Sequence, residues 1–198
     1  MWFRLIAMLF CIVFFINGCN SLISQFFGTH KLRTFTMEEA AENGIGDADF
    51  VELTGAWKSG DYIVVPPRTG ADKAILIFPL LTDEQMKAAD AGEKIQPAFI
   101  GWTKEFSLDC DLENTCAPRI QGDIKGVVRE MQRQKNKAHM LATNKYQLPE
   151  KVSYIEVGRQ PLAWYWNLLF VAGGIGFAFW IESRASRNRQ ITGAAKNS

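Results

Sequence analysis

The feature that most constrains this chain is a run of 20 residues without a charge near its C-terminal end. Leu162–Ile181 reads LAWYWNLLFVAGGIGFAFWI. At about 1.5 Å of rise per residue, a helix of this length spans the roughly 30 Å hydrocarbon core of a bilayer. Trp164 and Trp166 stand at its start and Trp180 near its end, where amphipathic rings prefer the headgroup region. The pattern predicts a transmembrane helix over 161–181.

A second apolar segment occupies residues 1–27, and three interpretations of it remain open. The first is a transmembrane helix, because no charge follows Arg4 and the segment is long enough to cross a bilayer. The second is a cleaved signal peptide with Leu5–Ile16 as its apolar core. The third is a bacterial lipoprotein signal, because the tetrapeptide INGC resembles a lipobox, in which Gly18 is removed and Cys19 is lipidated. The transmembrane helix is the leading interpretation.

The orientation of these segments is predicted from the positive charges beside them. Lys and Arg next to a span are retained in the cytoplasm. Arg4 precedes the first segment, and four basic residues lie in the tail 182–198: Arg184, Arg187, Arg189 and Lys196. Both termini are therefore expected in the cytoplasm and residues 28–160 outside it. The expected location is a bacterial inner membrane, with the central domain in the periplasm.

The region 28–160 is expected to fold as a membrane-anchored α+β domain. Runs rich in Val, Ile, Phe and Tyr predict strands at Phe50–Trp57, Asp61–Pro67, Lys73–Leu81, Ile95–Leu108 and Lys151–Val157, the first three forming a meander. N-caps at Thr36 and Thr82 predict short helices that end near Gly44 and Gly92. Residues 119–141 fit a helix, or a strand from Arg119 to Val128 followed by a helix. These elements predict a small, mostly antiparallel β-sheet or partly open barrel with two or three short helices.

Few residues in this sequence have the spacing of a catalytic or metal-binding motif. Cys110 and Cys116 are separated by a polar, turn-like stretch, and a local structural disulfide is the leading interpretation in an oxidising compartment. A redox role is disfavoured because the spacing is not C-x-x-C, and a zinc site would need two further ligands. His30 and His139 belong to no catalytic motif. We therefore predict no catalytic residue, metal site or cofactor.

Two other groups of residues are candidates for contact with partners. A net charge of +1 gives no field that would attract nucleic acid, so no nucleic-acid partner is predicted. A basic contact patch is predicted at Arg129, Arg133, Lys135 and Lys137, either as a solvated face or as a surface for anionic lipid headgroups or an acidic partner. Small residues at Ala172, Gly174, Gly176 and Ala178 permit close helix packing in the second span.

The function that these features favour is a non-enzymatic, membrane-tethered binding or assembly module of an envelope or membrane complex. Its expected partners are the lipid bilayer and a membrane or envelope protein. The alternative is a membrane-anchored extracytoplasmic enzyme without a linear motif, which a deep pocket with paired carboxylates would favour. A flat apolar or basic patch would favour the binding module.

Overall fold

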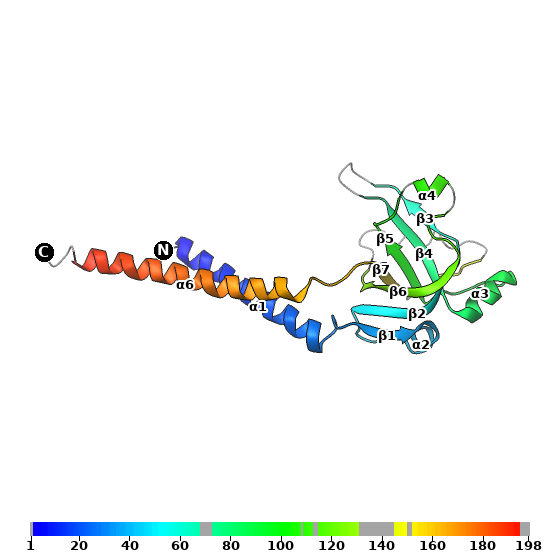
Figure 1. Cartoon of the computed structure of the whole chain (residues 1–198), viewed down its shortest axis with the longest axis horizontal. Coiled ribbons are helices and arrows are strands. Elements are labelled where there is room, and N and C mark those ends of the chain that lie inside the picture. The colour runs from blue at the N-terminus through cyan, green and yellow to red at the C-terminus, as the bar shows by residue number, and fades with distance from the viewer. Residues whose placement is uncertain are drawn as a thin grey trace. The chain divides into compact units, whose positions relative to one another are not determined.

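The computed structural model describes residues 2–67, 73–107, 109–112, 115–130, 145–149 and 152–194. The chain divides into two compact units. One consists of Met1–Gly28 with Leu162–Ser198, and the other is Thr29–Pro161. Figure 1 shows the helices of the first unit and the sheet of the second.

The second unit is built on a seven-stranded mixed sheet. Its strands are β1 (Arg33–Thr36), β2 (Phe50–Lys58), β3 (Ile63–Val65), β4 (Ile75–Leu81), β5 (Phe99–Thr103), β6 (Ile120–Val128) and β7 (Ser153–Val157). The strand order is β1-β2-β6-β7-β5-β4-β3, and an additional pairing of β2 with β4 closes five of these strands into a barrel. Closure removes the unpaired edges that an open sheet of these five strands would have.

The predicted combination of strands and short helices is confirmed, but the barrel is closed rather than partly open. Closure depends on β2, which pairs with β6 along most of its length and with β4 at Trp57 and Lys58. The register of β2 against β6 shifts between Leu53 and Ala56, where Gly55 has a φ of +70°. Such a bulge bends a strand and increases its twist, which allows one strand to serve two neighbours.

The sheet also differs from the expected antiparallel meander. Among the strands that the structure describes, β3 pairs with β4 alone, whereas β2 pairs with β4 directly. β5 and β7 are parallel, and so are β1 and β2, whereas the remaining barrel pairings are antiparallel. The strand at Arg33–Thr36 was not predicted, because four residues are too few to establish an alternating pattern.

Three hydrophobic clusters stabilise the barrel unit, the smallest of which contains Leu81, Met86, Ile95 and Tyr146. The interior cluster takes residues from all five barrel strands, including Leu53, Phe78, Phe99, Ile124 and Ile155. An outer cluster lies on the opposite face of β3, β4, β5 and β7 and contains Val65, Ile77, Ile100, Trp102 and Tyr154. β4 contributes to all three clusters, and every one of its residues is buried.

The short helices follow their predicted caps. α2 (Met37–Asn43) begins after Thr36, whose hydroxyl accepts a hydrogen bond from the Glu39 amide at 3.1 Å. α3 (Asp83–Asp90) begins with a complete capping box between Thr82 and Gln85. α4 (Asp109–Leu112) is a single turn in the loop between β5 and β6.

The first unit consists of two long helices, α1 (Trp2–Phe27) and α6 (Trp164–Ala194). Both are long and apolar enough to cross a membrane, over Leu5–Phe27 and Trp164–Arg187. A Cβ added at Gly174 would lie 3.0 Å from the Cys11 carbonyl, and one added at Gly18 would lie 3.0 Å from the Asn167 carbonyl. Cys11 of α1 therefore lies beside Gly174 of α6, and Gly18, further along α1, lies beside Asn167, which comes earlier in α6. The two helices pack antiparallel, with glycines at their contacts.

Candidate functional site

A polar cavity of about 240 Å³ opens on the barrel unit where β5 and β7 end. It is lined by Lys73, Thr103, Lys104, Glu105, Glu156, Val157 and Arg159. These residues come from three separate segments of the chain. The barrel topology brings the segments together, because β7 pairs with β5 in parallel and β5 pairs with β4.

Glu156 is the residue that distinguishes this cavity. Its position in β7 pairs it with Trp102 of β5 and with Val127 of β6. Side chains alternate along a strand, so Ile155 enters the barrel interior and Glu156 lies on the outer face with Tyr154. The result is a carboxylate whose side chain is only 10% exposed. Burial of a charged group is costly unless partners compensate it.

The compensation of Glu156 is incomplete. Its Oε2 has no hydrogen-bond partner among the described residues. Arg129 Nη1 lies 3.7 Å from that oxygen, which is within ion-pair range but beyond hydrogen-bond distance. The Arg129 side chain is 53% exposed, so water also solvates its guanidinium. A buried carboxylate with so little compensation favours a further positive charge in the cavity that it lines.

Hydrogen bonds and a cation–π contact hold the walls of the cavity in place. The Trp102 indole donates a hydrogen bond to the Arg129 carbonyl at 3.2 Å, which connects β5 to the end of β6. The Lys104 ammonium lies 5.8 Å from the centroid of the Trp102 ring. The Glu105 amide donates to the Thr103 hydroxyl at 3.1 Å and fixes the turn after β5. After β7, the Gly158 amide donates to the Lys125 carbonyl at 2.9 Å.

The basic patch predicted from the sequence is only partly described. Arg129 lies directly after β6 and forms the ion pair with Glu156. Arg133, Lys135 and Lys137 lie outside the described residues. Sequence analysis did not identify Lys73, Lys104, Glu156 or Arg159. The only signal for Glu156 is a lone carboxylate in the apolar strand SYIEV, and the others have no linear signature because they are distant in the sequence.

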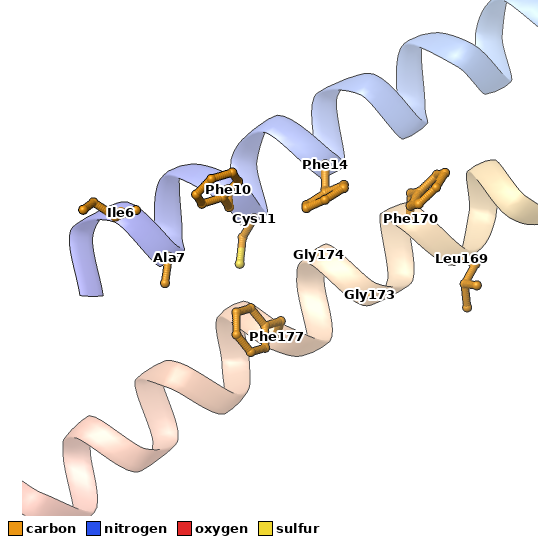
Figure 2. A pocket seen from close by; sticks show the side chains of 10 residues that line it. All are labelled: Ile6, Ala7, Phe10, Cys11, Phe14, Leu169, Phe170, Gly173, Gly174 and Phe177. Carbon is orange, nitrogen blue, oxygen red and sulfur yellow. The ribbon is translucent and has the colours of Figure 1, made fainter. Parts of the chain in front are cut away.

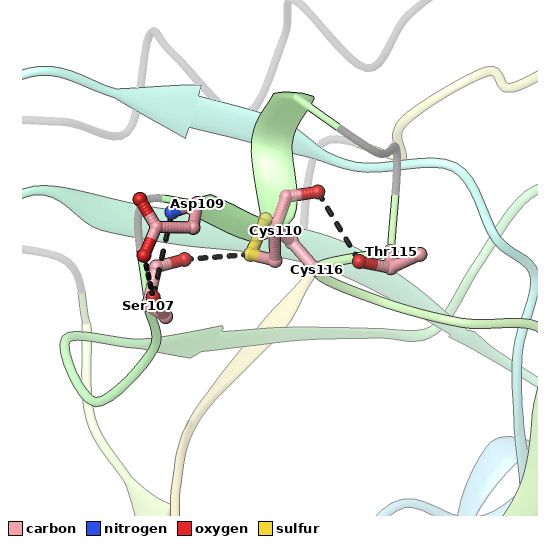
Figure 3. The surroundings of a disulfide bond; sticks show 5 residues. All are labelled: Ser107, Asp109, Cys110, Thr115 and Cys116. Carbon is pink, nitrogen blue, oxygen red and sulfur yellow. Dashed lines mark hydrogen bonds between the residues drawn. A yellow bond between two sulfur atoms is a disulfide. The ribbon is translucent and has the colours of Figure 1, made fainter.

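Cys110 and Cys116 lie at disulfide distance, with their Cα atoms 4.8 Å apart (Figure 3). The Thr115 amide and hydroxyl both donate to the Cys110 carbonyl, at 2.9 and 3.3 Å. Cys116 packs against the interior cluster beside the buried Ala117. This arrangement connects the β5–β6 loop to the barrel core and has the form of a structural crosslink.

The helix unit contains a second, apolar pocket of about 530 Å³ between α1 and α6. Figure 2 shows Cys11 and Phe14 of α1 directed toward α6. The Phe14 and Phe170 rings are stacked with their centroids 5.9 Å apart. Elsewhere in this unit, the buried Asn167 amide donates to Gln25 Oε1 at 3.3 Å, a polar contact between the helices that sequence analysis did not anticipate.

The small residues and the free cysteine named from the sequence occupy different environments in this unit. Gly174 is buried against α1, Ala178 is half-buried, and Ala172 and Gly176 are exposed. Cys19 lies within the continuous helix α1 and is half-buried. Among the described residues, no group of three or more His, Cys, Asp or Glu side chains is placed to hold a metal ion.

No family model, curated protein or solved structure matches this chain. Small barrels carry many unrelated functions, so architecture alone does not identify a ligand. The functional argument therefore rests on the chemistry of the sites described above.

Proposed function

We propose that this chain is a non-enzymatic binding or assembly module that α1 and α6 tether to a membrane. The barrel unit lies outside the cytoplasm, in the periplasm of a bacterial envelope, and binds a component of a membrane complex. The two termini lie in the cytoplasm, and the bilayer itself is the first partner.

The observation that carries this proposal is the apolar surface of the helix unit. Large apolar side chains remain exposed along both helices, among them Phe27 at 87% and Phe179 at 74%. Soluble monomers rarely expose contiguous apolar surface of this extent. Lipid hydrocarbon is the solvent that suits such a surface, because helices satisfy their own backbone hydrogen bonds within it. A paired hairpin of two helices with a glycine-lined contact fits this environment.

The charge distribution supports the orientation. Arg4 precedes the candidate span Leu5–Phe27, and Arg184 and Arg187 lie at the end of the span that begins at Trp164. Positive charges beside short spans favour the cytoplasmic side. A hairpin of two spans then has both termini on one side and the intervening barrel on the other.

Cysteine-accessibility labelling tests the topology. Cys11 and Cys19 are first replaced by Ala, and single reporter cysteines are then placed at Lys196 or at the exposed barrel residue Lys94. An impermeant maleimide added to cells with a permeabilised outer membrane should label the reporter at Lys94 and not the one at Lys196. Labelling of Lys196→Cys before lysis of the inner membrane would overturn the orientation, and release of the protein by alkaline carbonate would overturn the tether.

Co-purification tests the role as an assembly module. Protein solubilised in mild detergent should retain a membrane or envelope protein at fixed stoichiometry. Replacement of Arg129 and Lys104 by Glu reverses charge beside the cavity and should reduce that retention, whereas Lys94→Glu, a matched change on the exposed surface near α3, should not. Purification of the wild-type chain alone under every mild condition would argue against an assembly role.

A further inference from the structure

We propose that the cavity beside Glu156 binds a phosphoethanolamine group, supplied by the headgroup of a phosphatidylethanolamine lipid. This inference rests on the proposed tether, since it requires the cavity to be near a bilayer. The phosphate contacts the Lys and Arg side chains that line the cavity, and the primary ammonium donates to the carboxylate of Glu156.

The first step of the argument is the state of the carboxylate. Glu156 is nine-tenths buried, and its Oε2 accepts no hydrogen bond from any described residue. Arg129, its nearest described cation, is 3.7 Å away and half-exposed. An ammonium group has three donors and one positive charge, so a ligand ammonium in the cavity that Glu156 lines compensates the charge of this poorly paired carboxylate.

The second step is the charge of the remaining lining. Lys73, Lys104 and Arg159 contribute three cationic groups, and Glu105 adds one further carboxylate. A simple anion would be attracted to the cations but repelled by the two carboxylates. A simple cation would meet the reverse conflict. A ligand with a phosphate and an ammonium joined by two carbons matches both sets of charges. Its phosphate binds the Lys and Arg side chains, which are preferred phosphate ligands, and its ammonium binds the carboxylates.

The third step is the size of the cavity. A water molecule needs about 10–15 Å³ of cavity volume. The cavity volume of about 240 Å³ exceeds that requirement many times and gives room for a small polar headgroup. Its lining is too polar for an acyl chain, which the apolar surfaces of α1 and α6 suit better.

The fourth step is the position of the lining residues in the sequence. Arg159 precedes Trp164, the first residue of α6, by five residues. Five residues of extended chain reach at most about 18 Å. If α6 enters a bilayer, the chain therefore confines Arg159 to the neighbourhood of the headgroups. A lipid headgroup is then present at high local concentration, so even modest affinity per molecule is sufficient.

Lipid selectivity is the decisive measurement. Full-length protein in detergent is titrated with dioleoyl phosphatidylethanolamine, phosphatidylcholine and phosphatidylglycerol, which share acyl chains, and bound lipid is quantified by native mass spectrometry. Phosphatidylethanolamine should bind at least about tenfold more tightly than the other two lipids, because the loss of one charge-assisted hydrogen bond weakens binding by about that factor. Choline has no N–H donor and glycerol has no positive charge. Equal binding of the three lipids would overturn the inference.

Substitutions separate the two halves of the site. Glu156→Gln should remove most of the preference for phosphatidylethanolamine over phosphatidylcholine, while Lys104→Met and Arg159→Met should weaken binding of both. Glu93→Gln and Lys94→Met, at exposed positions outside the cavity, should leave binding unchanged. A preference that survives Glu156→Gln in folded protein would assign the selectivity to another site and overturn the inference.

Competition by soluble phosphoethanolamine tests whether the protein recognises the headgroup or the whole lipid. This experiment needs only the wild-type protein. Competition with lipid binding in the wild-type protein would support recognition of the headgroup itself. Binding of the soluble compound without binding of the lipid would overturn the lipid source. Absence of lipid selectivity in wild-type protein that resists carbonate extraction and retains its partner would overturn this inference alone, whereas carbonate release of the wild-type protein would overturn the proposed function.

Discussion

The guanidinium of Arg129 lies 3.7 Å from the carboxylate of Glu156, and the two side chains are exposed to very different extents, 53% and 10%. The pair is therefore asymmetric. Arg129 retains access to water when its partner is removed, but Glu156 loses its nearest described cation when Arg129 is removed.

This asymmetry predicts unequal effects on stability. Glu156→Gln should leave the free energy of unfolding unchanged within about 1 kcal/mol, because removing a poorly compensated buried charge offsets the lost attraction. Arg129→Met should lower it by about 1–3 kcal/mol, because the buried acceptor loses its compensation. Denaturant unfolding in detergent, followed by tryptophan fluorescence, measures both. Lys94→Met is the surface control, and a larger loss for Glu156→Gln than for Arg129→Met would contradict this account.

Tyr146 should make stability fall at alkaline pH. Burial and a 2.7 Å hydrogen bond from its hydroxyl to Asp61 raise the pKa of Tyr146 well above its ordinary value. The folded state then holds the phenolic proton more tightly than the unfolded state. The resulting stability is fully present below the unfolded pKa of about 10 and is lost as pH rises above it.

Tyr146→Phe tests this linkage. At neutral pH the variant should be less stable by about 1–3 kcal/mol, because Asp61 loses a charge-assisted hydrogen bond. Between about pH 9 and 11, the difference between wild type and variant should narrow. A difference in unfolding free energy that stays constant with pH would show that Tyr146 does not contribute through its proton.

The Cys110–Cys116 pair should act on stability and not on ligand binding. Replacing both residues by Ser should lower the free energy of unfolding by no more than about 3 kcal/mol, because the closed loop is short. Lipid selectivity should be unchanged, because neither residue lines the polar cavity. Non-reducing peptide mapping after rapid alkylation should recover the two cysteines as one crosslinked peptide. Recovery of both as alkylated thiols would refute the disulfide.

Gly174 and Gly176 should respond differently to the same substitution. A Cβ at Gly174 would lie 3.0 Å from the Cys11 carbonyl, whereas a Cβ at Gly176 would meet nothing within 4 Å in the described chain. Gly174→Val should therefore separate α1 from α6, and Gly176→Val should not. Crosslinking between cysteines at Phe14 and Phe170, whose rings are stacked, reports the separation when Cys11 and Cys19 are replaced by Ala. Equal loss of crosslinking in both variants would contradict this packing.

Local features of the sequence were sufficient to predict those elements whose determinants lie within one short segment of the chain. The caps at Thr36 and Thr82 and the apolar lengths of the two terminal helices were predicted correctly, because their determinants lie within one segment. The strands β2, β4 and β7 were also anticipated close to their observed bounds, although the predicted strand over Ile95–Leu108 is shorter in the structure, at Phe99–Thr103. For β6 (Ile120–Val128), the alternative of a strand from Arg119 to Val128 was right and a helix over the same residues was wrong. Pairing of Cys110 with Cys116 followed from their proximity in the sequence.

Only the tertiary structure decided how those elements combine. Closure of the barrel depends on Gly55, which bends β2 so that it reaches both β6 and β4. The sequence alternation placed Glu156 on one face of its strand but did not indicate that the face would be buried beside Trp102. The physical reason is that a cap or an apolar span is stabilised by near neighbours, whereas strand pairing joins distant segments whose register depends on the whole sheet. The charges of the proposed site meet only after that register is set.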